Sequence, residues 1–143
     1  MTPRTKNEIS ALMNNGIPRP LKVLLVENHA DTQRLVKMYL EHQGHHVTAA
    51  GTKAEAVAAA SEAVCDVLIS DIGLPDGDGW ELLTLLNEAH FRRPVFAIAM
   101  SGYGSRGDYQ RSSAAGFRLH IVKPFEPDAL DAALEEAARE IGG

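Results

Sequence analysis

Polar side chains with reactive chemistry follow four apolar runs of this chain, at the point where each run ends. Asp71 comes directly after the run 67–70, and a segment rich in glycine, proline and aspartate follows it. The other such residues are Glu27 and Asn28 after 23–26, Ser101 after 95–100, and Lys123 after 119–122. Apolar runs bounded by turn residues are typical of strands buried in a parallel sheet. Because open parallel sheets bind ligands at the carboxyl ends of their strands, these side chains are expected to converge on one edge.

Together these groups suit the transfer of a phosphoryl group onto a carboxylate. Asp71 could act as the nucleophile and form an acyl phosphate. Lys123 could hold a phosphoryl oxygen by its charge, and Ser101 could donate a hydrogen bond to another. Mg²⁺ prefers oxygen ligands, and four residues could supply them: Glu27 and Asp71 through carboxylates, Asn28 through its amide, and Gly73 through its backbone carbonyl. The competing interpretation of Asp71 is a turn-forming acid before glycine and proline.

The elements that must position these groups alternate along the chain. Strands are predicted at 23–26, 46–49, 67–70, 95–100 and 119–122. Helices are predicted at 31–42, from 52 onward after the capping-box pattern Thr52–Glu55, at 80–90, at 105–115 and from 127 to 141. The helix over 105–115 contains Gly107 and has poor periodicity, so it is expected to be the least stable one. Such alternation predicts a parallel sheet with helices on both faces.

Apolar spacing also predicts which side of three helices faces the core. In the helix 31–42 the predicted buried residues are Leu35, Met38, Tyr39 and His42. In the helix 80–90 they are Leu82, Leu85, Leu86 and Ala89. In the last helix they are Leu130, Ala133, Leu134, Ala137, Ala138 and Ile141.

Composition argues against several classes of function. The formal net charge of -5 is unlike that of a nucleic-acid-binding surface, which normally needs a basic patch. Cys65 is the single cysteine, so neither a disulfide framework nor a cysteine zinc site is expected. No apolar stretch approaches the length of a membrane span, and the first residues do not read as a secretory signal. We expect a cytoplasmic protein with no nucleic-acid or membrane partner, with an extension or linker over 1–20 and one domain over 21–143.

On these residues the sequence resembles the receiver domain of two-component response regulators. Val26-Glu27-Asn28 resembles the acidic pair of that family, and the segment Asp71–Gly79 resembles its phosphoacceptor loop. Met100-Ser101-Gly102-Tyr103 resembles its hydroxyl motif, and Lys123-Pro124-Phe125 its lysine motif. Four motifs in the right order make the resemblance specific, although any one alone would not be.

The resemblance implies a flavodoxin-like (βα)5 fold whose parallel strands have the order 2-1-3-4-5. It implies that Asp71 receives a phosphoryl group, with Mg²⁺, from a histidine kinase or phosphotransfer protein, and that a downstream protein target reads the result. The protein would be no enzyme beyond assisting its own phosphorylation and dephosphorylation. Ser101 and His120 would form the switch, and the helix 105–115, the last strand and the last helix would form the output face. The alternative for His120 is a partly exposed strand histidine.

Asn28 departs from the family pattern, which usually has a second Mg²⁺-ligating acid at this position. We expect weaker Mg²⁺ binding and slower phosphorylation, partly compensated by Asp31. Asn28 also favours an alternative function, a pseudo-receiver that docks partners without phosphate. With no room for an output domain after Ile141, the chain is expected to be a single-domain regulator, a phosphorelay intermediate, or a fragment of a hybrid histidine kinase or larger regulator. A small flavodoxin-like hydrolase or cofactor binder would need a glycine loop after the first strand, and residues 27–31 contain no glycine.

Two further groups of side chains suggest metals. His42, His45 and His46 straddle a helix end and a strand start, so zinc binding is not expected. Asp76 and Asp78 suggest a calcium loop, but glycine and proline stand where further oxygen ligands belong, and we reject that function too.

Overall fold

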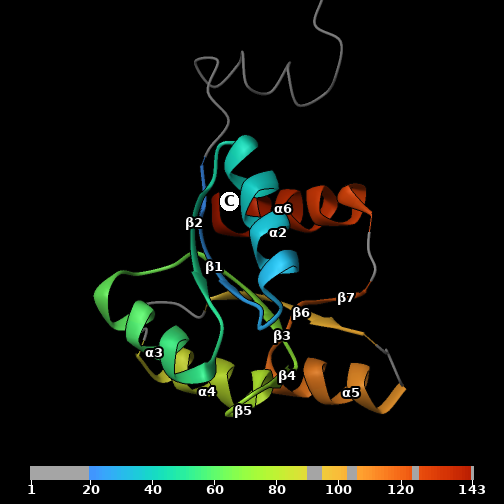
Figure 1. Cartoon of the computed structure of the whole chain (residues 1–143). Helices are drawn as coiled ribbons and strands as arrows, with labels where there is room; N and C mark the ends of the chain where they lie inside the picture. Colours follow the sequence, from blue (N-terminus) through green and yellow to red (C-terminus); the bar gives the residue numbers. More distant parts are fainter. Residues whose placement is uncertain (1–19, 90–94, 103–105, 124–125, 143) are drawn as a thin grey trace, which may run out of the picture.

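The computed structural model describes residues 20–89, 95–102, 106–123 and 126–142, and its central feature is a parallel sheet (Figure 1). The strands are β1 (Lys22–Val26), β2 (His46–Ala50), β3 (Val67–Asp71), β6 (Phe96–Ser101) and β7 (Leu119–Val122). Their order is β2-β1-β3-β6-β7. This confirms the predicted order 2-1-3-4-5, since β6 and β7 are the fourth and fifth strands of the sheet along the chain.

The register of the sheet brings the carboxyl ends of its strands to one edge. Val26 lies beside Ser70 in the β1–β3 pair, and Asp71 lies beside Met100 in the β3–β6 pair. Ser101 lies beside Val122 in the β6–β7 pair. Because parallel strands run in one direction, the polar residues that end them are carried to the same rim.

In the part of the chain that the structure describes, five helices cover the two faces of this sheet. They are α2 (Ala30–His42), α3 (Lys53–Glu62), α4 (Gly79–Ala89), α5 (Arg106–Ala115) and α6 (Pro127–Gly142). Figure 1 shows α2 and α6 on one side of the sheet and α3, α4 and α5 on the other. Two core clusters match this division: the first combines Val36 and Leu40 of α2 with Leu130 and Leu134 of α6, and the second contains buried residues of α3 and α4.

A short hairpin after β3 was not predicted. β4 (Gly73–Leu74) and β5 (Gly77–Asp78) pair antiparallel as a separate two-stranded sheet. The segment predicted to break the strand and reopen as a helix therefore folds back on itself first. Two-residue strands carry no periodicity, so no hydrophobic pattern signals them.

The predicted core face of α2 is wrong for three of its four residues, whereas Tyr39 is half-buried and packs against the core as predicted. Leu35 and Met38 are 66% and 59% exposed and His42 is exposed, whereas Val36 and Leu40 are buried. Apolar residues occupy most positions from 35 to 40, so the spacing is compatible with two faces of the helix. Packing against β1 and α6 selects the face that contains Val36 and Leu40.

The predicted core faces of α4 and α6 agree better with the structure. In α4, Leu82 and Leu86 are buried as predicted, but Leu83 is buried in place of Leu85, which is 41% exposed; the side chain of Ala89 is outside the described set. In α6 the predicted stripe is confirmed: Leu130, Ala133, Leu134 and Ala137 are buried, and Ala138 and Ile141 pack against them. The extension over 1–20 lies outside the described residues except for Pro20. Within the described ranges, no helix combines the length and the apolarity that crossing a membrane requires.

Substitutions on the two sides of α2 should differ in their effect on stability. Leu40→Ala should lower the free energy of unfolding by about 2–5 kcal/mol, because it leaves a cavity in the core. Leu35→Ala on the same helix should change it by no more than about 0.5 kcal/mol, since that side chain is largely exposed. Urea denaturation of both variants measures these changes, and equal losses would contradict the assignment of the core face.

Candidate functional site

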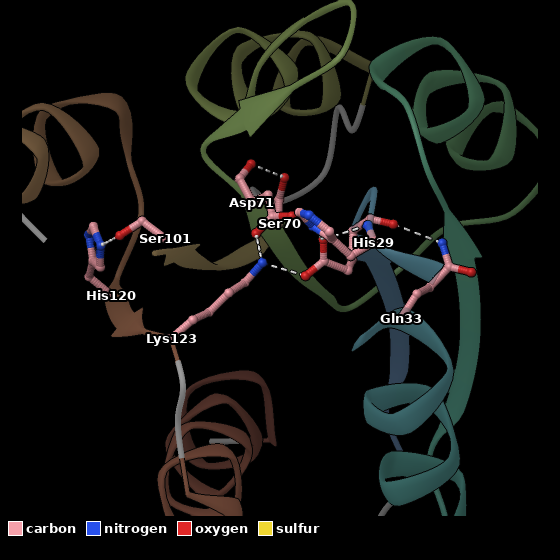
Figure 2. A network of polar contacts seen from close by, with 8 residues as sticks. His29, Gln33, Ser70, Asp71, Ser101, His120 and Lys123 are labelled. Atoms are coloured by element: carbon pink, nitrogen blue, oxygen red, sulfur yellow. Dashed lines mark hydrogen bonds and ion pairs between the residues drawn. The ribbon is translucent and has the colours of Figure 1, made fainter. Parts of the chain in front are cut away.

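The carboxyl edge of the sheet holds a cluster of three charged side chains from three strands. Lys123 Nζ contacts Glu27 Oε1 and lies 2.5 Å from Asp71 Oδ1 (Figure 2). Glu27 is fully buried and Asp71 is 7% exposed. The structure therefore brings together three of the residues selected from the sequence, as an acid–lysine–acid bridge.

The pKa values of the two carboxyl groups in this cluster are shifted in opposite directions. Burial raises the pKa of Asp71 to about 7, and the neighbouring Glu27 adds to the rise while Lys123 opposes it. Burial would also raise the pKa of Glu27, but contacts with Asp71, Lys123 and the His29 backbone N–H hold it well below its usual range. The pKa of Lys123 is raised: burial would lower it, but Asp71 and Glu27 outweigh burial. Asp71 is therefore the carboxyl group that takes up a proton first.

Glu27 is fixed by the turn that follows β1. Its backbone N–H donates to Ala50 O of β2 at 3.0 Å, and its backbone carbonyl accepts from Gln33 Nε2 at 3.0 Å. Its carboxylate accepts from the His29 backbone N–H, at 3.0 Å from Oε2. These contacts hold the carboxylate inside the site, and sequence reasoning missed both His29 and Gln33 because neither belongs to a periodic pattern.

Asp71 is fixed by the backbone on either side of it. The Ser70 hydroxyl donates to Asp71 O at 2.8 Å, and the next residue, Ile72, donates its N–H to Met100 O at 3.0 Å. Gly79 returns to the same place, and a Cβ on it would lie 2.5 Å from Asp71 O. A side chain at position 79 would therefore displace the backbone of Asp71. Ser70 is the one polar side chain before the acid in a buried run, which was the available signal for its role.

The Ser101 and His120 side chains form a second group next to the charged cluster. Ser101 Oγ lies 2.8 Å from His120 Nε2, and Figure 2 shows the hydroxyl pointing toward the imidazole. The His120 ring contacts the ring of Tyr109 of α5 in a tilted arrangement, with centroids 4.2 Å apart. Burial lowers the pKa of His120, and Asp108 opposes this. His120 is a half-buried residue of β7, as the alternative of a partly exposed strand histidine describes, and its ring also contacts α5; its role in a switch stays a prediction.

The remaining predicted ligands lie at the mouth of the site. Asn28 and Gly73 are both exposed, one in the turn after β1 and one at the start of the hairpin. Asp31 is exposed in the first turn of α2, where its Oδ1 lies 3.8 Å from Arg34 Nη1; compensation by Asp31 stays a prediction. Tyr103, Pro124 and Phe125 of the quoted motifs lie outside the described residues.

Known proteins resemble this chain in both sequence and structure. Residues 23–135 match the family described as the response regulator receiver domain. An uncharacterized 14.6 kDa protein of Leptolyngbya boryana is 31% identical over 107 residues, which is 75% of this chain and 82% of that protein. The transcriptional regulatory protein ResD of Bacillus subtilis is 31% identical over 106 residues, 74% of this chain but 43% of its own length. This chain spans about half the length of the transcriptional regulators that it matches.

Solved structures give the same result. Chemotaxis protein CheY4 of Vibrio cholerae superposes with a TM-score of 0.78 at 28% identity, over 83% of this chain and 99% of that one. A CheY-like receiver domain protein of Methanospirillum hungatei superposes with a TM-score of 0.75 at 31% identity, over 87% of this chain and 100% of that one.

The raised pKa of Asp71 predicts a pH dependence of stability in metal-free protein. Between the unfolded value of 3.8 and the folded value of about 7, the folded state holds a proton that the unfolded state releases. The contribution of Asp71 to the stability of the folded state is therefore complete below the unfolded pKa. It is lost progressively as the pH rises from that value through the folded pKa of about 7. In Asp71→Asn this loss should disappear.

Urea unfolding in chelator between pH 5 and 8 measures the effect. The difference between the wild type and Asp71→Asn isolates the carboxyl group, because all other ionisable side chains are the same in both proteins. If the two proteins gave parallel curves of unfolding free energy against pH, folding would not raise the pKa of Asp71.

Proposed function

Because this chain belongs to the response regulator receiver family, we propose that it accepts a phosphoryl group on Asp71 from a histidine kinase or phosphotransfer protein. The phosphorylated form would then contact a downstream protein target in the cytoplasm. Residues 21–143 would carry this activity, and 1–20 would be an extension or linker. The protein assists only its own phosphorylation and dephosphorylation, so it is not an enzyme in the usual sense.

One observation carries the proposal: Lys123 is shared between the two buried carboxylates of Glu27 and Asp71. A buried like-charged pair is costly unless a cation compensates it, so purely structural positions seldom hold one. Perturbed carboxyl groups beside a lysine, at the ligand-binding edge of a parallel sheet, are typical of a reactive site.

The chemistry follows from these positions. An oxygen of ionised Asp71 attacks phosphorus, and the bond between phosphorus and the donor's imidazole nitrogen breaks as the new acyl phosphate bond forms. The imidazole leaves with the electron pair and takes a proton from solvent. Lys123 is placed to turn from Asp71 toward a phosphoryl oxygen and offset its charge. In dephosphorylation, water would attack the same phosphorus as the bond between the Asp71 oxygen and phosphorus breaks, which returns the carboxylate and releases inorganic phosphate and a proton to solvent.

The residues present fit Mg²⁺. Two buried carboxylates share one lysine in the cluster, so a further cation would supply a compensating charge for the ionised form of Asp71. Glu27, Asn28, Asp71 and the Gly73 carbonyl would hold the ion, all through oxygen. When bound, Mg²⁺ would neutralise the charge on the phosphoryl oxygens.

Ser101 and His120 would form the switch. The Ser101 hydroxyl is bonded to His120, whose ring lies against Tyr109 of α5. If the phosphoryl group draws this hydroxyl to itself, His120 loses this hydrogen bond, and its ring can shift relative to Tyr109 of α5. Chemistry at Asp71 would thus change the surface formed by α5, β7 and α6.

The central test is intact mass after incubation with Mg²⁺ and acetyl phosphate. The wild type should gain a single phosphoryl adduct, and Asp71→Ala should gain none. A wild type without an adduct, even at high Mg²⁺ and with candidate kinases, would favour the pseudo-receiver alternative that Asn28 suggests. On the phosphorylated sample, hydrogen exchange over 106–115 should change, and an unchanged pattern would remove the switch from the proposal.

Asn28 predicts a weakened metal site. Asn28→Asp should tighten Mg²⁺ binding by about tenfold, or about 1.4 kcal/mol, because it adds a carboxylate at the mouth of the site. Calorimetric titration of Mg²⁺ into both proteins measures this, with Asp31→Asn as a second variant that tests compensation. Equal affinities of the wild type and Asn28→Asp would refute the weakening.

A further inference from the structure

The segment between Asp71 and α4 is closed tightly at its base. Gly79 N–H donates to Ile72 O at 2.7 Å, and the Asp78 carboxylate accepts from Glu81 N–H at 2.8 Å, which caps the start of α4. Within the hairpin, Gly73 pairs with Asp78. The Gly73 carbonyl, named above as one ligand for Mg²⁺, is therefore positioned by the hairpin.

Asp76, at the turn of this hairpin, reaches the start of a different helix. Its Oδ1 accepts from Lys53 N–H at 2.7 Å, and its Oδ2 accepts from Ala54 N–H at 2.9 Å. The first N–H groups of a helix have no partner inside the helix and favour a negative charge. These two bonds lower the pKa of Asp76, although the side chain is exposed. Asp76 is thus a capping residue supplied from outside α3.

The contact between hairpin and helix extends to side chains. A Cβ on Gly77 would lie 3.0 Å from Lys53 Nζ, so the hairpin backbone rests against the Lys53 side chain. The same Nζ lies 3.4 Å from Glu81 Oε1 of α4. The Lys53 side chain therefore connects α3 to α4 beside the hairpin. The Asp76 carboxylate connects the hairpin itself to the backbone N–H groups at the start of α3.

The start of α3 is itself attached to the other half of the site. The helix follows β2, whose last residue Ala50 accepts the backbone N–H of Glu27 at 3.0 Å. Only Gly51 and Thr52 separate this residue from α3. A path of short contacts therefore runs from Glu27 through Ala50 and the start of α3 to Asp76 and the hairpin.

We propose that Asp76 is a positioning residue that ties the β4–β5 hairpin to α3 and so fixes the Gly73 carbonyl relative to Glu27 and Asp71. The inference rests on the proposed function, because the consequence of this positioning is the affinity for Mg²⁺. The two aspartates rejected above as a calcium site thus hold the hairpin between two helix starts, Asp76 at α3 and Asp78 at α4. Asp76 touches neither metal nor substrate in this assignment and acts through Gly73.

Thr52→Ala supplies a matched control for Asp76→Ala. The Thr52 hydroxyl accepts from Glu55 N–H at 3.1 Å, so this variant also removes a cap from α3 but leaves the hairpin contacts in place. Two measurements are made on both variants: hydrogen exchange of the amides 73–79 in chelator, and calorimetric titration with Mg²⁺. A conservative variant, Asp76→Asn, keeps one acceptor oxygen and covers the case in which Asp76→Ala fails to fold.

Asp76→Ala should speed exchange across the hairpin and weaken Mg²⁺ binding by about tenfold, as loss of a residue that orients a metal ligand typically does. Thr52→Ala should do neither, and Asp76→Asn should lie between Asp76→Ala and the wild type. Equal effects of Asp76→Ala and Thr52→Ala, or unchanged hairpin exchange in Asp76→Ala, would overturn the proposal. Hairpin exchange needs no metal and no phosphoryl donor, so it decides on Asp76 even where the mass experiment rejects the proposed function.

Discussion

The site depends on one constraint: two carboxylates are buried together, and one lysine must serve both. Glu27 and Asp71 come from neighbouring strands, β1 and β3, and Lys123 reaches them from just beyond β7 at the edge of the sheet. Because charges removed from water need close partners, the ends of these three strands must bring the three side chains into contact. The bridge also leaves Asp71 as the group most easily changed, because its ionised form is the least favourable of the three.

The backbone around Asp71 is built to hold that strained group still. Ser70 and Gly79 both lie against its carbonyl, and Gly79 returns there only after the hairpin has closed. The hairpin is in turn fastened to α3 and α4 by two aspartates. Rigid support of this kind would serve the reaction proposed for Asp71, since small displacements of a reacting group cost much of its rate.

Around this rigid centre, the link to α5 is lighter. Among the described residues, it includes a hydrogen bond between Ser101 and His120 and a ring contact between His120 and Tyr109. α5 also contacts α4, where Trp80 Nε1 donates to Ser112 Oγ at 2.9 Å and Arg111 stacks on the indole ring. A helix held by a few polar contacts rather than by a broad apolar face is suited to shifting its position when one contact changes.

The sequence alone determined the order along the chain of the five sheet strands and the five described helices, and the residue types at the strand ends. Buried parallel strands are continuous apolar runs, and their ends are marked by a change to polar residues, so both signals are local in the chain. The stripe of α6 was equally clear, because Leu130, Leu134 and Ile141 all lie on its core-facing side. The resemblance to receiver domains rested on the same strand-end residues.

Only the tertiary structure decided how those groups contact one another. The sequence could not show that Lys123 would bridge both acids, that α2 would bury Val36 and Leu40 rather than Leu35 and Met38, or that Asp76 would cap a helix more than twenty residues before it. Each of these depends on the roll of a helix or the path of a loop. Such choices are made by packing between segments distant in sequence, which no local pattern records.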